Sequence, residues 1–151
     1  MPTVTPFLWF DTQAEEAMNL YTSIFPRARV LSVNRAQGRV MSVEFELEGQ
    51  KFMGLNAGPH YKFNEAVSFF VGCETHQEID DLWAKLIADG GSPSRCGWLK
   101  DRFGLSWQII PNSLGRMIGS SDPSRSKRAV DAMLAMEKLD VRKLEEAFNG
   151  A

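Results

Sequence analysis

The residue of greatest chemical interest in this chain is a glutamine inside an apolar strand. Gln108 stands in the run "LSWQIIP", which follows "CGWLKDRFG", with a tight turn expected at Gly104. Buried polar side chains are nearly always hydrogen-bonded. Gln108 is therefore either a core amide paired with backbone or a neighbouring side chain, or a hydrogen-bonding group that faces a small ligand. The sequence leaves both interpretations open.

The chain has two histidines, and neither stands in a carboxylate-histidine-nucleophile pattern. His60 lies in the loop "NAGPHYKFNEA", where Gly58-Pro59 favours a turn. It is either an exposed loop residue or an acid or base at the mouth of a pocket, because imidazole titrates near neutral pH. His76 falls in the first turn of an expected helix, and we interpret it as a surface residue.

Two cysteines and a row of glutamates are the other candidates for chemistry. Cys73 and Cys96 form no CxxC pair, and we interpret both as small buried hydrophobes that would act as nucleophiles only with a stabilised thiolate. The alternation in "RVMSVEFELEGQ" predicts a half-buried antiparallel strand with Glu44, Glu46 and Glu48 on its solvated face. Glu44 would be a candidate base only if that face turned inward.

The first part of the chain is predicted to form a strand, a helix and three further strands, one of which carries the glutamate row. "TVTPFLWFD" predicts a buried strand, and the helix after it opens with Thr12 and Glu15 at capping-box spacing and ends before Pro26. "ARVLSVNRA", the glutamate strand and "KFMGLNAG" complete the unit, with a hairpin turn at Gly49-Gln50. The buried face of the glutamate strand is predicted to hold Met41, Val43, Phe45 and Leu47.

The same order of elements returns in the second part of the chain. "AVSFFVGCE" predicts a strand, Thr75 and Glu78 repeat the capping-box spacing, and Gly90-Gly91 ends the helix. "SRCGWLKD" and "LSWQIIP" predict further strands. Each unit alone would leave one apolar sheet face bare, so we expect the two units to close on each other around a hollow that suits a ligand.

The last part of the chain is predicted to be helical. "GRMIGSSDPSRSK" is rich in Gly and Ser and predicts an exposed connector. Asp122 is the expected N-cap of a helix with Pro123 at its first position, and a shorter helix follows from Asp140. We therefore expect one domain over residues 1–113, with modules at about 3–57 and 66–111, and a helical extension over 114–151.

Composition excludes several classes of partner. The 151 residues carry a net charge of -2, which gives no electrostatic reason to expect a nucleic acid or a membrane surface. No apolar run approaches the roughly 20 residues that span a bilayer, and the first residues lack the basic and apolar regions of a signal peptide. We expect a reduced, cytoplasmic protein without a nucleic-acid or membrane partner.

The two strand-helix-strands units resemble the vicinal oxygen chelate superfamily, which includes glyoxalase I and bleomycin-resistance proteins. The resemblance becomes more specific in "TPFLWFD…AEEAMNLYTSIFP", "EGQKFMGLNAGPHYKFNEAVSFFV", "CGWLKDRFGLSWQIIP" and "AVDAMLAMEKLDVRKLEEAF", which are similar to the PhnB-like family. It implies an α+β fold with two βαβββ modules that form a curved mixed or antiparallel sheet, the glyoxalase/bleomycin resistance fold, plus C-terminal helices. Members of this family often carry the description 3-demethylubiquinone 3-methyltransferase.

The superfamily holds a divalent metal with His, Glu or Gln side chains on the first and last strands of each unit. The matching strands here offer Thr5, Asn56, Ser68 and Gln108, and the family pattern often has Glu at the place of Gln108. These neutral groups are weak ligands for transition metals, which prefer imidazole, carboxylate or thiolate. We therefore predict no metal site and no cofactor.

We expect the same neutral groups to line a pocket for a small organic molecule. A few convergent donors and acceptors among aromatic side chains are what such a pocket needs. Trp9, Trp98 and Trp107 fit either the core or a pocket wall. The candidate pocket residues are Thr5, Phe7, Trp9, Asn56, His60, Ser68, Phe70, Trp98 and Gln108.

Three functions are compatible with these expectations. The first is metal-independent binding of a small molecule between the modules. The second is an enzyme, a methyltransferase by the family description or a lyase or isomerase by the superfamily. The third is a structural or regulatory homodimer without ligand. Methyl transfer from S-adenosylmethionine usually needs a Gly-rich loop after a parallel strand, and no GxGxG stretch occurs, so we favour binding. The superfamily also implies a homodimer, with the C-terminal helices on their own subunit or on the partner.

Overall fold

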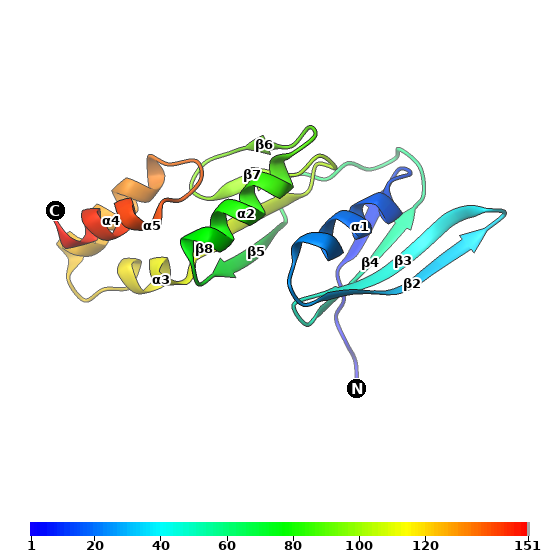
Figure 1. Cartoon of the computed structure of the whole chain (residues 1–151), viewed down its shortest axis with the longest axis horizontal. Coiled ribbons are helices and arrows are strands. Elements are labelled where there is room, and N and C mark those ends of the chain that lie inside the picture. Colours follow the sequence, from blue (N-terminus) through cyan, green and yellow to red (C-terminus); the bar gives the residue numbers. More distant parts are fainter. Residues whose placement is uncertain (151) are drawn as a thin grey trace. The chain divides into compact units, whose positions relative to one another are not determined.

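The computed structural model describes residues 1–150. The chain divides into two compact units, Met1–Lys62 and a second that begins at Phe63. Each unit contains one four-stranded mixed sheet with a helix packed on one face (Figure 1). Among residues 1–150, no helix has both the length and the apolar character needed to cross a bilayer.

The first unit runs strand, helix, strand, strand, strand. It comprises β1 (Phe7–Phe10), α1 (Ala14–Ile24), β2 (Ala28–Ala36), β3 (Arg39–Leu47) and β4 (Gln50–Asn56), and its sheet has the order β1-β4-β3-β2. β1 pairs with β4 in parallel, and the other pairs are antiparallel. The β3–β4 hairpin turns on Glu48 and Gly49, which both have positive φ, as two-residue hairpin loops require.

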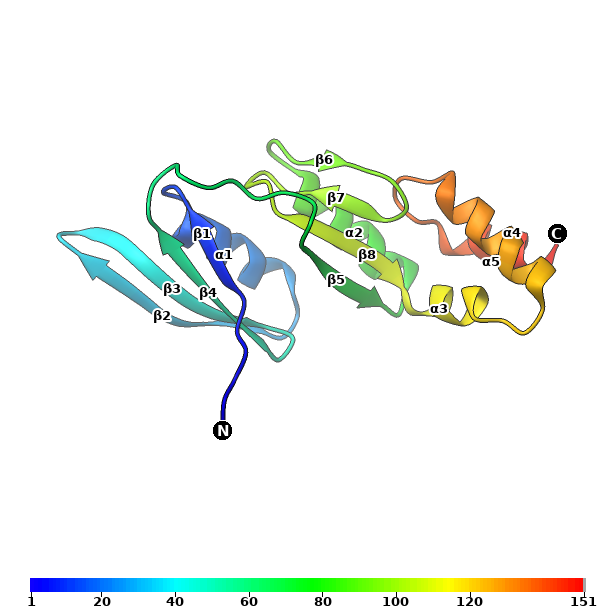
Figure 2. The same cartoon turned by 180° about the vertical axis from the view of Figure 1, so that it is seen from behind.

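The second unit repeats this plan and adds helices. It comprises β5 (Ser68–Cys73), α2 (His76–Ile87), β6 (Ser92–Pro93), β7 (Trp98–Lys100), β8 (Ser106–Pro111), α3 (Asn112–Ile118), α4 (Pro123–Leu134) and α5 (Val141–Asn149). Its sheet has the order β5-β8-β7-β6, again with a parallel outer pair (Figure 2). The predicted α+β repeat of two βαβββ modules is therefore confirmed, as two open sheets.

The core of the first unit lies between its sheet and α1. Val43, Phe45 and Leu47 of β3 are buried as the alternation predicts. Met41 continues the same face but is 49 % exposed, so its predicted burial is wrong. α1 begins only at Ala14, and Met41 instead lines a surface groove next to the start of this helix.

The two helix starts differ in how they are capped. At α2 the predicted cap is confirmed, because the Thr75 hydroxyl accepts a hydrogen bond from the Glu78 N–H at 3.1 Å. At α1 the predicted Thr12 cap is wrong, since Gln13 is the N-cap residue and makes no capping hydrogen bond with its side chain. The Asn56 Oδ1, from the end of β4, accepts from the Ala14 N–H at 2.9 Å instead.

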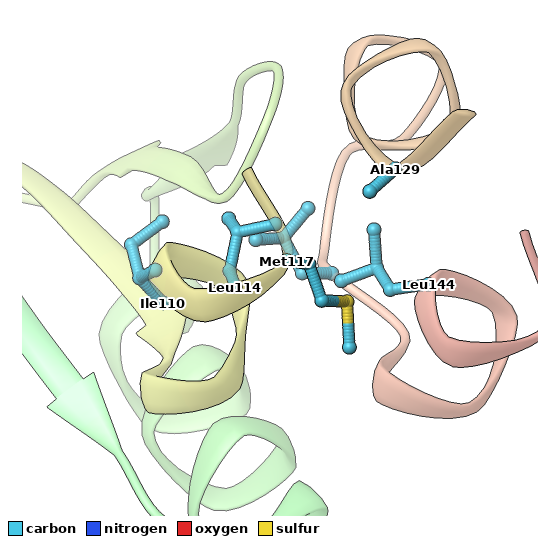
Figure 3. Packing of buried hydrophobic residues seen from close by; sticks show 6 residues of the cluster. Ile110, Leu114, Met117, Ala129 and Leu144 are labelled. Carbon is cyan, nitrogen blue, oxygen red and sulfur yellow. The ribbon is translucent and has the colours of Figure 1, made fainter. Parts of the chain in front are cut away.

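The C-terminal helices pack on the second unit through an apolar cluster (Figure 3). The predicted Asp122 cap is confirmed, with its carboxylate accepting from the Ser124 and Arg125 N–H groups. The predicted connector after β8 instead contains the helix α3, because Leu114 and Met117, three residues apart, bury one side of a Gly/Ser-rich segment. The cluster consists of Ile110, Leu114, Met117, Ala129, Leu139 and Leu144. Residue 151, the end of the expected extension, lies outside the described residues.

Candidate functional site

The second sheet has one face covered by α2 and one face free of it (Figure 1). Side chains alternate between the faces of a strand, so Leu99, Trp107 and Ile109 are buried on the α2 side. We call the opposite side the open face of the second sheet. In one row across it stand Ser92, Lys100, Ser106 and Ser68, and the next row holds Trp98, Gln108 and Phe70.

The pair of Gln108 and Ser68 lies on this open face. Gln108 Nε2 donates a hydrogen bond to Ser68 Oγ at 2.9 Å, which joins β8 to β5. The Gln108 amide oxygen accepts no hydrogen bond from any other residue in 1–150. Gln108 is half-buried and Phe70, its register partner on β5, is 64 % exposed. The amide is thus held in place by one bond and keeps an acceptor available on an accessible surface.

A small hollow lies at the β6–β7 end of the sheet and is lined by Trp98 and Ser106, the register partners of Gln108 and Ser68. Its volume is about 230 Å³, and its wall includes Trp98, Leu99 and Pro93 together with Lys100 and Ser106. The Ser106 side chain is 1 % exposed, and its Oγ has no hydrogen-bond partner within residues 1–150. Trp98 therefore belongs to the wall of a hollow, whereas Trp107 belongs to the core.

A buried aspartate holds the β7–β8 hairpin that carries these residues. Asp101 Oδ1 accepts from the N–H groups of Phe103 and Leu105, at 2.9 and 3.0 Å, and Oδ2 accepts from Trp107 Nε1 at 2.9 Å. Gly104 has a φ of +90°, which favours glycine, so the predicted turn is confirmed. Sequence reasoning missed Asp101, although an aspartate three residues before a turn glycine is a known turn signal.

The first unit has an open face of the same kind. A Cβ placed on Gly54 would lie 3.6 Å from the Ala14 Cβ, so Gly54 faces α1 and the strand residues on either side of it face away. Phe7 and Trp9 stand on the side away from α1, and Phe7 is 54 % exposed. Thr5 precedes β1 and is half-buried. The predicted grouping of Phe7 and Trp9 on one face is thus found.

The loop after β4 covers the Trp9 ring. Trp9 Nε1 donates to the Gly58 carbonyl at 2.9 Å, and the Tyr61 ring packs edge-on with a centroid distance of 4.9 Å. The His60 ring lies 6.4 Å from the Trp9 ring. His60 is exposed, so this loop places an accessible imidazole beside the indole.

Asn56 is not brought to the open face of the first sheet. It is the register partner of the buried Phe10, and its amide bonds to Ala14 and to the Val40 carbonyl. It lines a groove of about 840 Å³ at the start of α1, in which Arg35 and Glu15 form an ion pair at 2.7 Å. The structure therefore gives Asn56 a capping and strand-linking role.

Neither cysteine is arranged as a nucleophile. Cys73 is buried, and burial, together with the nearby Glu78 carboxylate, raises the pKa of its thiol to about 11. Cys96 is half-buried with φ +60°, and its N–H bonds to the Met136 carbonyl. The Cys73 thiol therefore stays protonated at neutral pH and is a poor nucleophile.

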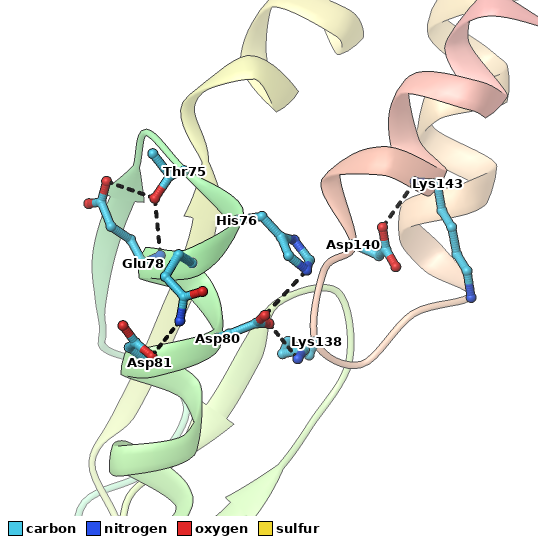
Figure 4. A network of polar contacts seen from close by, with 9 residues as sticks. Thr75, His76, Glu78, Asp80, Asp81, Lys138, Asp140 and Lys143 are labelled. Carbon is cyan, nitrogen blue, oxygen red and sulfur yellow. Dashed lines mark hydrogen bonds and ion pairs between the residues drawn. The ribbon is translucent and has the colours of Figure 1, made fainter.

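His76 belongs to a surface ion-pair network rather than to either open face (Figure 4). Its Nε2 lies 3.3 Å from Asp80 Oδ2, and Lys138 Nζ lies 2.5 Å from Asp80 Oδ1. The hydrogen bond from Lys138 holds the pKa of the Asp80 carboxyl below its usual value. This network ties α2 to the loop between α4 and α5.

The glutamate row of β3 also forms ion pairs. Glu44 Oε2 lies 3.3 Å from Lys51 Nζ, and Glu46 Oε1 lies 3.5 Å from Arg29 Nε. Throughout residues 1–150, no three His, Cys, Asp or Glu side chains gather closely enough to hold a metal ion. These glutamates stand on the open face of the first sheet, because Glu44 and Phe7 are both register partners of Met53 on β4. The rows named on the second sheet carry instead an amide, hydroxyls and one lysine.

Comparison with known proteins places the chain in a family. Residues 2–110 match the family described as 3-demethylubiquinone-9 3-methyltransferase. A PhnB protein from Bacillus cereus, which carries the same description, is 36 % identical, with 73 % of this chain and 99 % of that chain covered and a TM-score of 0.68. The chain belongs to this PhnB family. No curated protein matches the chain.

More distant structures show the fold to which the PhnB family belongs. A glyoxalase/bleomycin resistance protein from Albidiferax ferrireducens is 12 % identical over 73 % of this chain and 98 % of its own length, with a TM-score of 0.52. A glyoxalase-related enzyme from Fulvimarina pelagi is 14 % identical over 76 % and 91 %, also with a TM-score of 0.52. The chain has the glyoxalase/bleomycin resistance fold.

Proposed function

We propose that this PhnB-family chain binds a small organic molecule without a metal ion, through the open face of its second sheet. The observation that supports this is the hydrogen-bonded pair of Gln108 and Ser68, bordered by the aromatic rings of Phe70 and Trp98. The exposed ring of Phe70 offers apolar area, and the amide oxygen of Gln108 offers an acceptor. Binding sites for small molecules combine such features.

The chemistry of these groups favours orientation of a ligand over its activation. An amide neither gives up nor takes up a proton near neutral pH, and an unactivated hydroxyl is a weak nucleophile. Both hold ligands through directed hydrogen bonds. In the first unit, Thr5, Phe7, Trp9 and His60 are the corresponding residues of the proposal. Phe7 is an exposed aromatic residue on an equivalent face, and the exposed His60 lies beside Trp9.

Methyl transfer is the second candidate, because the family description names it. S-adenosylmethionine is usually held by a Gly-rich turn between a parallel strand and a helix. The turn from β1 to α1 consists of Asp11, Thr12 and Gln13, and the turn from β5 to α2 consists of Glu74 and Thr75. These turns contain no glycine that would let backbone N–H groups approach the cofactor, so we favour binding over methyl transfer.

The proposal also includes the oligomeric state and the location of the chain, which we propose to be a homodimer in the cytoplasm. Contiguous exposed apolar patches mark interaction surfaces, and Phe7 and Phe70 are exposed aromatic side chains that such a surface would use. Light scattering after size-exclusion chromatography measures the mass in solution. A mass of one chain, about 17 kDa, at micromolar concentration would contradict this part of the proposal and leave the binding site unaffected.

Saturation-transfer NMR with a library of small aromatic amides and alcohols tests the binding function. The wild-type chain is expected to bind members of the library, and Gln108→Leu is expected to lose them. Gln77→Leu is the matched control, since Gln77 is exposed on α2 and bonds only to Asp81. Equal binding by the wild type, Gln108→Leu and Gln77→Leu would contradict the proposal.

A further inference from the structure

The hollow beside Trp98 contains a buried hydroxyl that lacks a partner. Ser106 is 1 % exposed, and its Oγ makes no hydrogen bond to any residue in 1–150. Leaving a buried polar group unpaired destabilises a protein, because the group loses its hydrogen bonds to water and gains none in return. Such groups are rare in folded proteins. A ligand that accepts a hydrogen bond from Ser106 would remove this deficit, so the hydroxyl itself indicates a binding position.

A lysine stands directly beside this hydroxyl. Lys100 on β7 and Ser106 on β8 are register partners in an antiparallel pair. Side chains of such partners project from the same face, with Cβ atoms about 4.5–5.5 Å apart. Both residues line the hollow of about 230 Å³. A single acceptor group in the hollow can therefore meet an ammonium group and a hydroxyl group together.

The ammonium group of Lys100 already forms an ion pair with a carboxylate of the chain. Glu65, in the segment before β5, pairs with Lys100 Nζ, and this hydrogen bond lowers the pKa of the Glu65 carboxyl. The side chain of Glu65 is 62 % exposed, and that of Lys100 is 39 % exposed. Ion pairs with this exposure are weak, because water screens both charges. Glu65 is thus a replaceable carboxylate at the mouth of the hollow.

We propose that the ligand of this site is a small organic acid whose carboxylate takes the place of Glu65 on Lys100 and accepts a hydrogen bond from Ser106. Its hydrocarbon part packs on the Trp98 ring, which forms one wall of the hollow. Ligand pockets of drug-sized molecules usually measure about 300–1,000 Å³, so a hollow of about 230 Å³ suits a short acid. This inference rests on the proposed binding function and adds the class of ligand.

Titration calorimetry of the full chain with butyrate, butyramide and inorganic phosphate tests the inference. Glu65→Gln removes the competing carboxylate and is expected to tighten butyrate binding about threefold. Lys100→Gln is expected to weaken it about tenfold or more, and Ser106→Ala about fivefold. Glu48→Gln is the matched control, because Glu48 also forms an exposed ion pair, with Arg27, but in the first unit. It is expected to leave butyrate binding unchanged.

The three ligands distinguish a requirement for negative charge from a requirement for a hydrocarbon part. Butyrate is expected to bind more tightly than butyramide, which lacks the charge, and than phosphate, which lacks the hydrocarbon part. Equal affinity of butyrate and butyramide, or no gain in Glu65→Gln, overturns the inference. So does phosphate binding as tight as butyrate binding with no effect of Ser106→Ala. Lys100→Arg keeps the charge and is expected to retain butyrate binding, which assigns a loss in Lys100→Gln to the missing charge.

Failure of this inference differs from failure of the proposed function. If neutral aromatic fragments bind and Gln108→Leu abolishes that binding while no carboxylate responds to Glu65→Gln, only the ligand class is wrong. If butyrate and the neutral fragments all fail to bind to the wild-type chain and to Glu65→Gln, both are wrong.

Discussion

Gln108 Nε2 lies 2.9 Å from Ser68 Oγ, and this hydrogen bond joins two strands whose residues are 40 positions apart. The pair stands on the sheet face that α2 does not cover, next to the exposed ring of Phe70. An amide in this position contributes little to the core. Its amide oxygen has no protein partner within residues 1–150, which leaves it available as the acceptor that the proposed function requires.

The substitution Gln108→Leu separates a core role from a binding role. One neutral hydrogen bond contributes about 0.5–1.5 kcal/mol, and the leucine recovers part of this through apolar contact. We expect the free energy of unfolding, measured in urea, to change by less than about 1 kcal/mol while fragment binding is lost. A large loss of stability together with unchanged binding would show that Gln108 is a core amide.

Ser106→Ala is expected to stabilise the chain. The substitution removes a buried hydroxyl that has no partner within residues 1–150, so the free energy of unfolding should rise by about 1 kcal/mol. Ser94→Ala, at an exposed position of the same hollow, should change it by less than about 0.5 kcal/mol. A destabilised Ser106→Ala chain would mean that the hydroxyl is already satisfied.

Asp101→Ala is expected to be among the most destabilising substitutions in the second unit. It leaves Trp107 Nε1 and the N–H groups of Phe103 and Leu105 without their acceptor. Hydrogen bonds to a charged group are each worth about 1.5–3 kcal/mol and are not additive, so we expect a loss of about 3 kcal/mol or more. Asp81→Ala, on the exposed side of α2, is the control. A loss below about 1 kcal/mol for Asp101→Ala would contradict this account of the hairpin.

Asn56→Ala tests the remote cap of α1. The Asn56 side chain accepts from Ala14 N–H and donates to the Val40 carbonyl. Loss of a helix cap usually costs about 0.5–2 kcal/mol, and we expect a value in the upper part of this range because the link to Val40 is lost as well. Asn19→Ala on the exposed side of α1 should be nearly neutral. Equal effects of the two substitutions would argue against a capping role.

The two thiols are expected to differ in reactivity, and Cys73 is expected to make the stability of the chain depend on pH. The folded-state pKa of Cys73 is raised from 9.0 to about 11, so its contribution to stability is present below pH 9 and is lost as the pH rises through about 11. At pH 8, a chromogenic disulfide reagent should modify Cys96 first and Cys73 only after unfolding. Equal rates for both thiols in the folded chain would contradict the burial of Cys73.

Local patterns predicted the modules well. The Thr75–Glu78 spacing correctly placed the start of α2, and the alternation of β3 correctly placed Val43, Phe45 and Leu47 in the core. These features depend on residues a few positions apart. They can therefore be read without knowledge of the rest of the fold.

The failures depend on contacts between distant segments. The cap of α1 comes from Asn56, 42 residues after Ala14, so Thr12 was a reasonable but wrong choice. α3 forms because Leu114 and Met117 have an apolar cluster to pack on, which the Gly/Ser-rich sequence does not reveal. The pairing of Glu65 with Lys100 likewise joins a loop to a strand in a way that no spacing indicates.

Backbone chemical-shift mapping of the isotope-labelled full chain, titrated with a bound fragment in the presence of a metal chelator, tests the central claim most directly. The account predicts shifts concentrated at Ser68, Phe70, Trp98 and Gln108, and their disappearance in Gln108→Leu. Shifts that avoid the open face of the second sheet, or that appear only after zinc or manganese is added, would contradict it.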